Sequence, residues 1–76
     1  DLCLKIRAFG ENVIIEGNPG DRARCEIYDL RGTKVTDLPV KDTSLNTVPV
    51  PAGSRGVFIV RVSDGKRIHT GKVVFP

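Results

Sequence analysis

Residues 56–75, GVFIVRVSDGKRIHTGKVVF, contain two β-prone segments around a short turn. Five of the six residues in Val57–Val62 are β-branched or aromatic, and only Arg61 is charged. This composition favours a strand. Its nearly continuous apolar character predicts a central strand that is covered on both sides for most of its length. The pair Asp64-Gly65 matches a two-residue type I′ hairpin turn, so a partner strand is expected over about Arg67–Phe75.

The same period-two alternation continues outward from this hairpin, interrupted by clusters of turn residues. It predicts further strands at Cys3–Phe9, Val13–Glu16, Ala23–Tyr28, Lys34–Leu38 and Leu45–Val50. Pro49 places the last of these at a sheet edge, because proline has no N–H for a ladder bond. Gly20 and Gly32 are expected to take positive φ in turns, and Gly71 to mark a β-bulge.

These elements predict an all-β fold: an Ig-like antiparallel β-sandwich of about seven short strands with Greek-key connections. A chain of 76 residues has room for one core, so residues 1–76 are expected to form a single domain. There is no run of about 18 apolar residues, hence no transmembrane segment is expected. The chain contains no Met and no signal peptide, which suggests a module of a longer protein.

The expected core consists of the inward residues of these strands, with a large share from Phe9, Phe58 and Phe75. In the first strand, alternation places Leu2, Leu4, Ile6 and Ala8 on one face and Cys3 on the other. Cys25 is expected to be a buried core residue. Cys3 is therefore not its natural partner, although the sequence leaves a disulfide between them open.

No set of residues predicts catalysis, so the protein is not expected to be an enzyme. Ser63, Asp64 and His69 could form a triad only around one tight hairpin, where side chains diverge into water. A buried Cys25 would be inert. One histidine and two distant cysteines cannot form a zinc site, so no metal or cofactor is expected.

The formal net charge is +3. Several basic residues lie on or beside the last hairpin and could form a recognition surface, namely Arg61, Lys66, Arg67 and Lys72. Nucleic acid is not the expected partner, because Tyr28 is the only aromatic residue that alternation clearly directs outward for base stacking.

Three segments resemble a known family. Residues 25–35, CEIYDLRGTKV, resemble the "V-x-V-Y-D-L-x-G-x-x-V" segment of the C-terminal sorting domains of type IX secretion cargo. Residues 50–62, VPAGSRGVFIVRV, are similar to the family's "L-x-x-G-x-Y-x-V-x-V" element. The segments 65–66 and 71–74 resemble its closing "G-x-x-x-x-x-K-V-V" strand. The family-like residues are Tyr28, Asp29, Gly32, Gly56, Phe58 and Lys72.

The resemblance implies a non-catalytic C-terminal module of a larger exported protein. Such a module would take an upstream cargo domain through the periplasm to the cell surface or the medium. Its implied partners are the secretion machinery and a sortase-like peptidase of the outer membrane. Two features depart from the family pattern: Phe58 stands in place of the usual tyrosine, and Ser54 and Arg55 lengthen the loop between Gly53 and Gly56.

The residues also leave two other classes of function open. An Ig-like accessory module could bind a glycan or a protein for a neighbouring domain, and exposed aromatic residues would favour this role. An oligomerisation or spacer domain would be favoured by an exposed apolar edge, for which Leu45–Val50 is the candidate.

Overall fold

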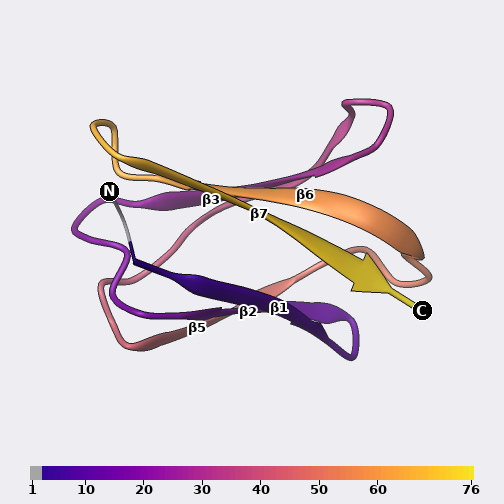
Figure 1. Cartoon of the computed structure of the whole chain (residues 1–76), viewed down its shortest axis with the longest axis horizontal. Helices are drawn as coiled ribbons and strands as arrows, with labels where there is room; N and C mark the ends of the chain where they lie inside the picture. The colour runs from indigo at the N-terminus through magenta and orange to yellow at the C-terminus, as the bar shows by residue number, and fades with distance from the viewer. Residues whose placement is uncertain (1–2) are drawn as a thin grey trace.

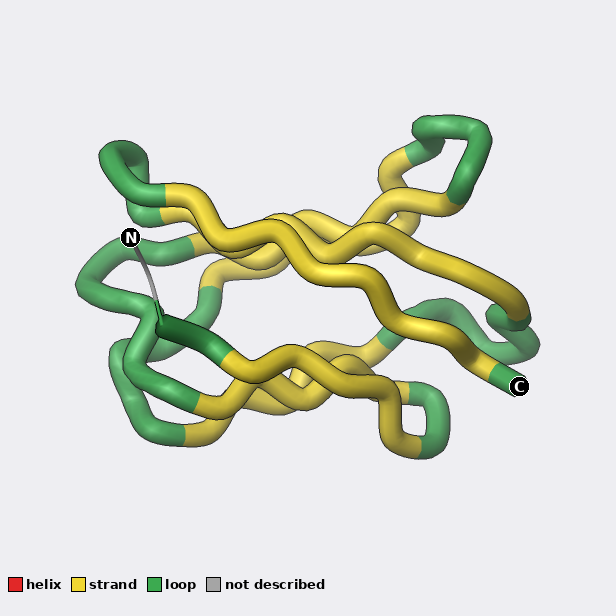
Figure 2. Tube along the Cα trace, viewed as in Figure 1, coloured by secondary structure: helices red, strands yellow, loops and turns green. Residues whose placement is uncertain are grey.

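The computed structural model describes residues 3–76, and these form seven strands in two antiparallel sheets (Figures 1 and 2). The three-stranded sheet has the order β1-β2-β5 and consists of β1 (Lys5–Phe9), β2 (Asn12–Glu16) and β5 (Leu45–Pro49). The four-stranded sheet has the order β4-β3-β6-β7 and consists of β4 (Lys34–Pro39), β3 (Arg24–Asp29), β6 (Gly56–Ser63) and β7 (Ile68–Phe75). The predicted β-sandwich is therefore confirmed.

The order of the strands interlocks the two sheets. The chain leaves the three-stranded sheet after β2, forms the β3–β4 hairpin, returns as β5 beside β2, and crosses again to place β6 beside β3. This is a Greek-key arrangement of the Ig-like kind. β5 is an edge strand, as Pro49 predicted.

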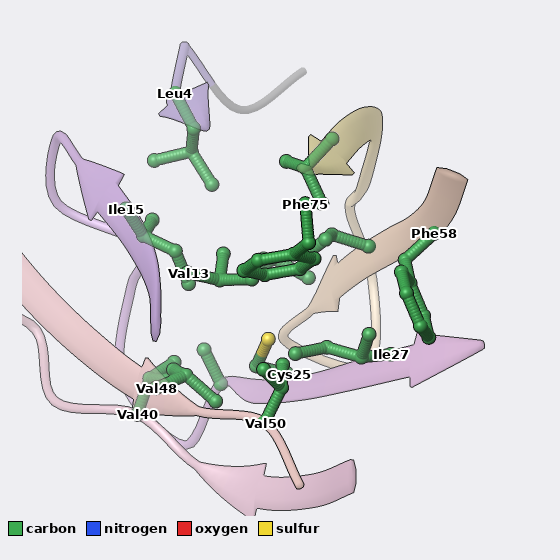
Figure 3. Packing of buried hydrophobic residues seen from close by; sticks show 14 residues of the cluster. Leu4, Val13, Ile15, Cys25, Ile27, Val40, Val48, Val50, Phe58 and Phe75 are labelled. Atoms are coloured by element: carbon green, nitrogen blue, oxygen red, sulfur yellow. The ribbon is translucent and has the colours of Figure 1, made fainter. Parts of the chain in front are cut away.

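The core fills the space between the sheets (Figure 3). β3 contributes Cys25 and Ile27, which are fully buried, and they face Val13 and Ile15 of β2 across the sandwich. Phe58 and Phe75 pack edge to face, with ring centroids 5.6 Å apart. Two of the three phenylalanines are therefore core residues, as expected.

Phe9 is not a core residue, and its prediction was wrong. Its side chain is 68% exposed, whereas Leu4 is buried and Ile6 and Ala8 pack against the core. Because faces alternate along a strand, Phe9 must point away from the sheet face that carries Ile6 and Ala8. The expectation for Leu2 concerns a residue outside the described part of the chain.

Three expectations for the β6–β7 hairpin also need correction. β6 is a central strand, but it faces the other sheet on one side only, so Val57 and Ile59 are half-buried. The turn is not type I′, since that type needs two positive φ angles and only Gly65 has one. Gly71 is paired with Val60 without a bulge.

Gly71 serves a different purpose, which is the close approach of β1 to β7. A Cβ atom at this position would lie 3.3 Å from Cδ1 of Ile6. The irregularity in the sheet lies instead between β3 and β4, where the register shifts at Ile27 and Tyr28.

Replacing Ile27 by alanine tests the assignment of the core. We expect Ile27→Ala to lower the free energy of unfolding by about 2–5 kcal/mol, because it removes buried methyl groups and leaves a cavity. Leu45→Ala, at a side chain that is 56% exposed, should change it by no more than about 0.5 kcal/mol. Urea denaturation of both variants measures the difference. Equal effects would contradict the core assignment.

Candidate functional site

The residues that resemble the family motifs come together at one end of the four-stranded sheet. Asp29 is paired with Phe58 and Tyr28 with Ile59, and Ile59 is in turn paired with Lys72. Gly32 lies in the turn that follows β3, and Gly56 begins β6. Figure 1 shows this turn and the start of β6 at the same end of the molecule as the C-terminus. Segments distant in sequence therefore lie side by side at this end of the sheet.

The turn after β3 is held by the carboxylate of Asp29. Its Oδ1 atom accepts hydrogen bonds from the backbone N–H groups of Arg31 (2.9 Å) and Thr33 (3.0 Å). Its Oδ2 atom accepts one from Nη2 of Arg31 at 3.0 Å. The hydrogen bond from Thr33 is the main cause that lowers the pKa of Asp29, and the contacts with Arg31 add to it. Gly32 completes the turn at a φ of 88°.

This turn displays Leu30 to solvent, with 71% of its surface exposed. Beside it lies a shallow hollow of about 480 Å³, which we call the β3–β6 hollow. Its apolar lining consists of Leu30, Val35, Pro51, Val57 and Phe58, and its polar lining of Asp29, Arg31, Ser54, Arg55 and Gly56. An open, mostly apolar surface of this kind is suited to binding a side chain of another protein.

The loop that was expected to depart from the family pattern forms one wall of this hollow. Within this loop, the Oγ atom of Ser54 donates a hydrogen bond to the carbonyl oxygen of Pro51 at 2.6 Å. The backbone N–H of Gly53 donates to Oε2 of Glu11 at 3.4 Å, which ties the loop to the β1–β2 turn. Gly56, at a φ of 90°, then directs the chain into β6. As a result, Arg55 lies exposed at the rim of the hollow.

The four residues of the predicted basic surface are spread over the hairpin. Arg61 forms an ion pair with Glu26 (3.3 Å), and Arg67 forms one with Asp64 (2.9 Å). Lys66 lies in the turn, at the opposite end of the sheet from the β3–β6 hollow. Lys72 is exposed on the outward side of β7, near the hollow, and makes no ion pair within residues 3–76.

The outward face of the sheet carries a chain of ion pairs that the sequence did not predict. Asp37 pairs with Arg24 at 2.8 Å and with Lys34 at 3.1 Å, and Lys34 also pairs with Glu26 at 3.1 Å. The Glu26–Arg61 pair extends the chain to β6. These ion pairs join opposite charges on neighbouring strands. They could be predicted from the sequence only if the register of the strands were known. A second hollow of about 340 Å³ adjoins these residues.

Two of the residues considered for catalysis, Ser63 and Asp64, hold the hairpin turn by hydrogen bonds. Both carboxylate oxygens of Asp64 accept hydrogen bonds within the 64–67 turn, chiefly from the backbone of Arg67 and Lys66, and these lower its pKa. The Oγ atom of Ser63 accepts a hydrogen bond from the N–H of Gly65 at 3.2 Å. His69 is half-buried on β7.

The two cysteines are not bridged: Cys3 is exposed and Cys25 is buried. Burial is the main cause that raises the pKa of Cys25 to about 12, with smaller effects from Asp37 and Glu26. Within residues 3–76, there is no cluster of His, Cys, Asp or Glu that could hold a metal ion. The described part of the chain also has no helix that could cross a membrane.

The fold and its surface define the chain as a small β-sandwich module of the Ig-like class. A family model described as the secretion system C-terminal sorting domain matches residues 9–75, which is nearly the whole chain. The chain belongs to this family, and it carries a type IX secretion sorting signal. Such a tail implies an exported protein that reaches the cell surface or the extracellular space. No curated protein and no solved structure matches the chain.

Gly32 provides a test of the Asp29 turn. We expect Gly32→Ala to lower the free energy of unfolding by about 1–2 kcal/mol, because a left-handed backbone is unfavourable for alanine. No atom lies within 4 Å of a Cβ at this position, so the effect is conformational rather than steric. Gly32→Asn should cost less, since asparagine tolerates this conformation. Denaturant unfolding of both variants measures the free energy of unfolding. An alanine variant as stable as the native chain would contradict the role of Gly32 in the turn.

Proposed function

We propose that the domain directs a fused cargo protein through the type IX system because the machinery recognises it as a folded unit. The element of the domain that the machinery contacts is the β6–β7 hairpin. In this proposal the domain is non-catalytic and crosses the periplasm with its cargo. A sortase-like peptidase of the outer membrane then acts on the delivered protein. The observation that carries the proposal is the family match over residues 9–75, which covers the folded sandwich up to and including the terminal hairpin.

Strand β7 supports this choice because it is an edge strand. It is hydrogen-bonded to β6 on one side, and within residues 3–76 no strand pairs with its other side. Its outward positions carry Thr70, Lys72 and Val74, all of which are exposed. A strand of eight residues at the edge of a sheet suits pairing with a strand of a receptor.

The same hairpin is part of the core, since Val73 and Phe75 are buried. Deleting residues 72–76 from a cargo should leave it in the periplasm, but this deletion removes core residues together with the edge strand. Substitutions at outward positions of β7 separate recognition from folding, because exposed side chains contribute little to stability.

We therefore expect the double variant Thr70→Glu/Lys72→Glu to lower export of a full-length cargo while the domain stays folded. The matched control is Lys5→Glu/Thr47→Glu, which makes the same change of charge at exposed positions on the edge strands of the other sheet. Immunoblots of periplasm and medium measure export, and thermal melting of the 76-residue chain checks folding. Normal export of the β7 variant, or equal loss in the control, would exclude the hairpin as the contacted element.

A further inference from the structure

The β3–β6 hollow combines features that the stability of the fold does not require. Leu30 is the most exposed of the large hydrophobic side chains in the described part of the chain, yet the Asp29 turn holds its backbone in place by hydrogen bonds. An apolar residue fixed in an exposed position loses little conformational freedom when it is covered by a partner. The turn thus presents Leu30 in advance of binding.

The motif residues surround the same place. Asp29, Gly56 and Phe58 line the hollow, and Gly32 lies in the turn that forms its wall. Tyr28 precedes the lining residue Asp29 in β3, and Lys72 precedes Val73, which is paired with the lining residue Phe58. The three segments that resemble the family are therefore adjacent at this end of the sheet, although residues 36–49 separate the first from the second in the sequence.

The charges at the rim indicate the chemistry of the occupant. Arg55 is exposed and makes no ion pair within residues 3–76, and the side chain of Arg31 is 85% exposed although it contacts Asp29. Asp29 is the one acidic residue in the lining, and its oxygens already accept hydrogen bonds from Arg31 and Thr33. The rim is thus net positive, and a complementary partner would bring carboxylates.

We propose that the β3–β6 hollow is a docking site for an acidic segment of a protein in the transport machinery. An apolar side chain of that segment packs against Leu30 and Val57, and a neighbouring carboxylate pairs with Arg55. This inference rests on the proposed sorting function and adds a second contact to the hairpin. A second copy of the domain fits less well, because the acidic group of its own hollow is already engaged.

The test uses Leu30→Glu and Arg55→Glu in a full-length cargo, in a bacterium with a type IX system. We expect each variant to lower delivery of cargo to the surface or medium by about tenfold or more, as for the loss of a central binding residue. Arg55→Gln should have a smaller effect than Arg55→Glu, because charge reversal adds repulsion of an acidic partner.

Matched controls distinguish this contact from a general effect of surface charge. Leu45→Glu introduces the same change at another exposed leucine, and Lys5→Glu reverses another exposed cation. Both should be exported like the native cargo. Thermal melting of the 76-residue chain should show that all these variants are folded.

The outcomes separate the two proposals. If the native cargo itself stays in the periplasm, the sorting function is wrong. If the native cargo is delivered and the Leu30 and Arg55 variants are delivered equally well, the docking site is wrong. A concentration-dependent dimer of the native domain that Leu30→Glu abolishes, seen by sedimentation, would assign the hollow to self-association and overturn the proposed partner.

Discussion

The inward side of β6 is the constraint on which the rest of the domain depends. This strand pairs with β3 on one side and β7 on the other, and its residues Phe58, Val60 and Val62 face the three-stranded sheet. It therefore joins the middle of the chain, the C-terminus and the opposite layer. The terminal hairpin cannot be removed without opening the core, so a signal carried by this hairpin is present only when the domain is folded.

The same pairing separates the two ends of the four-stranded sheet. At one end, hydrogen bonds to Asp29 fix a turn that exposes Leu30 above an apolar hollow. Further along the sheet, Glu26 and Asp37 form ion pairs with the outward cations Arg24, Lys34 and Arg61. The uneven distribution of charge and apolar area makes this end of the sheet distinct, and it is the end at which we propose that a partner docks.

Much of the fold was predictable because strands alternate between two environments. Alternation, together with the β-prone composition of Val57–Val62, identified seven strands and the burial of Cys25, and proline chemistry identified β5 as an edge. The errors arose where a residue was assigned a role from its type and not from its position in the alternating pattern. Phe9 was assigned to the core for its size, although its position in β1 points outward. Gly71 was interpreted as a bulge, whereas it makes room for Ile6.

The candidate site was only partly predictable. The motif residues could be named from the sequence, but their convergence depends on the register of β3 against β6 and of β6 against β7. The partners of Arg61 and Arg67 depend on the same register and on the shape of the 64–67 turn. Local patterns do not fix these long-range relations, so the β3–β6 hollow could not be predicted.

We propose that the folded domain is itself the sorting signal. The most direct measurement fuses residues 1–76, with some native upstream sequence, to a periplasmic fluorescent reporter in a type IX-competent bacterium. Surface and medium fluorescence are then compared with those of a strain that lacks the transport apparatus. We expect export that requires the apparatus. A well-folded fusion that stays in the periplasm of the competent strain would contradict it.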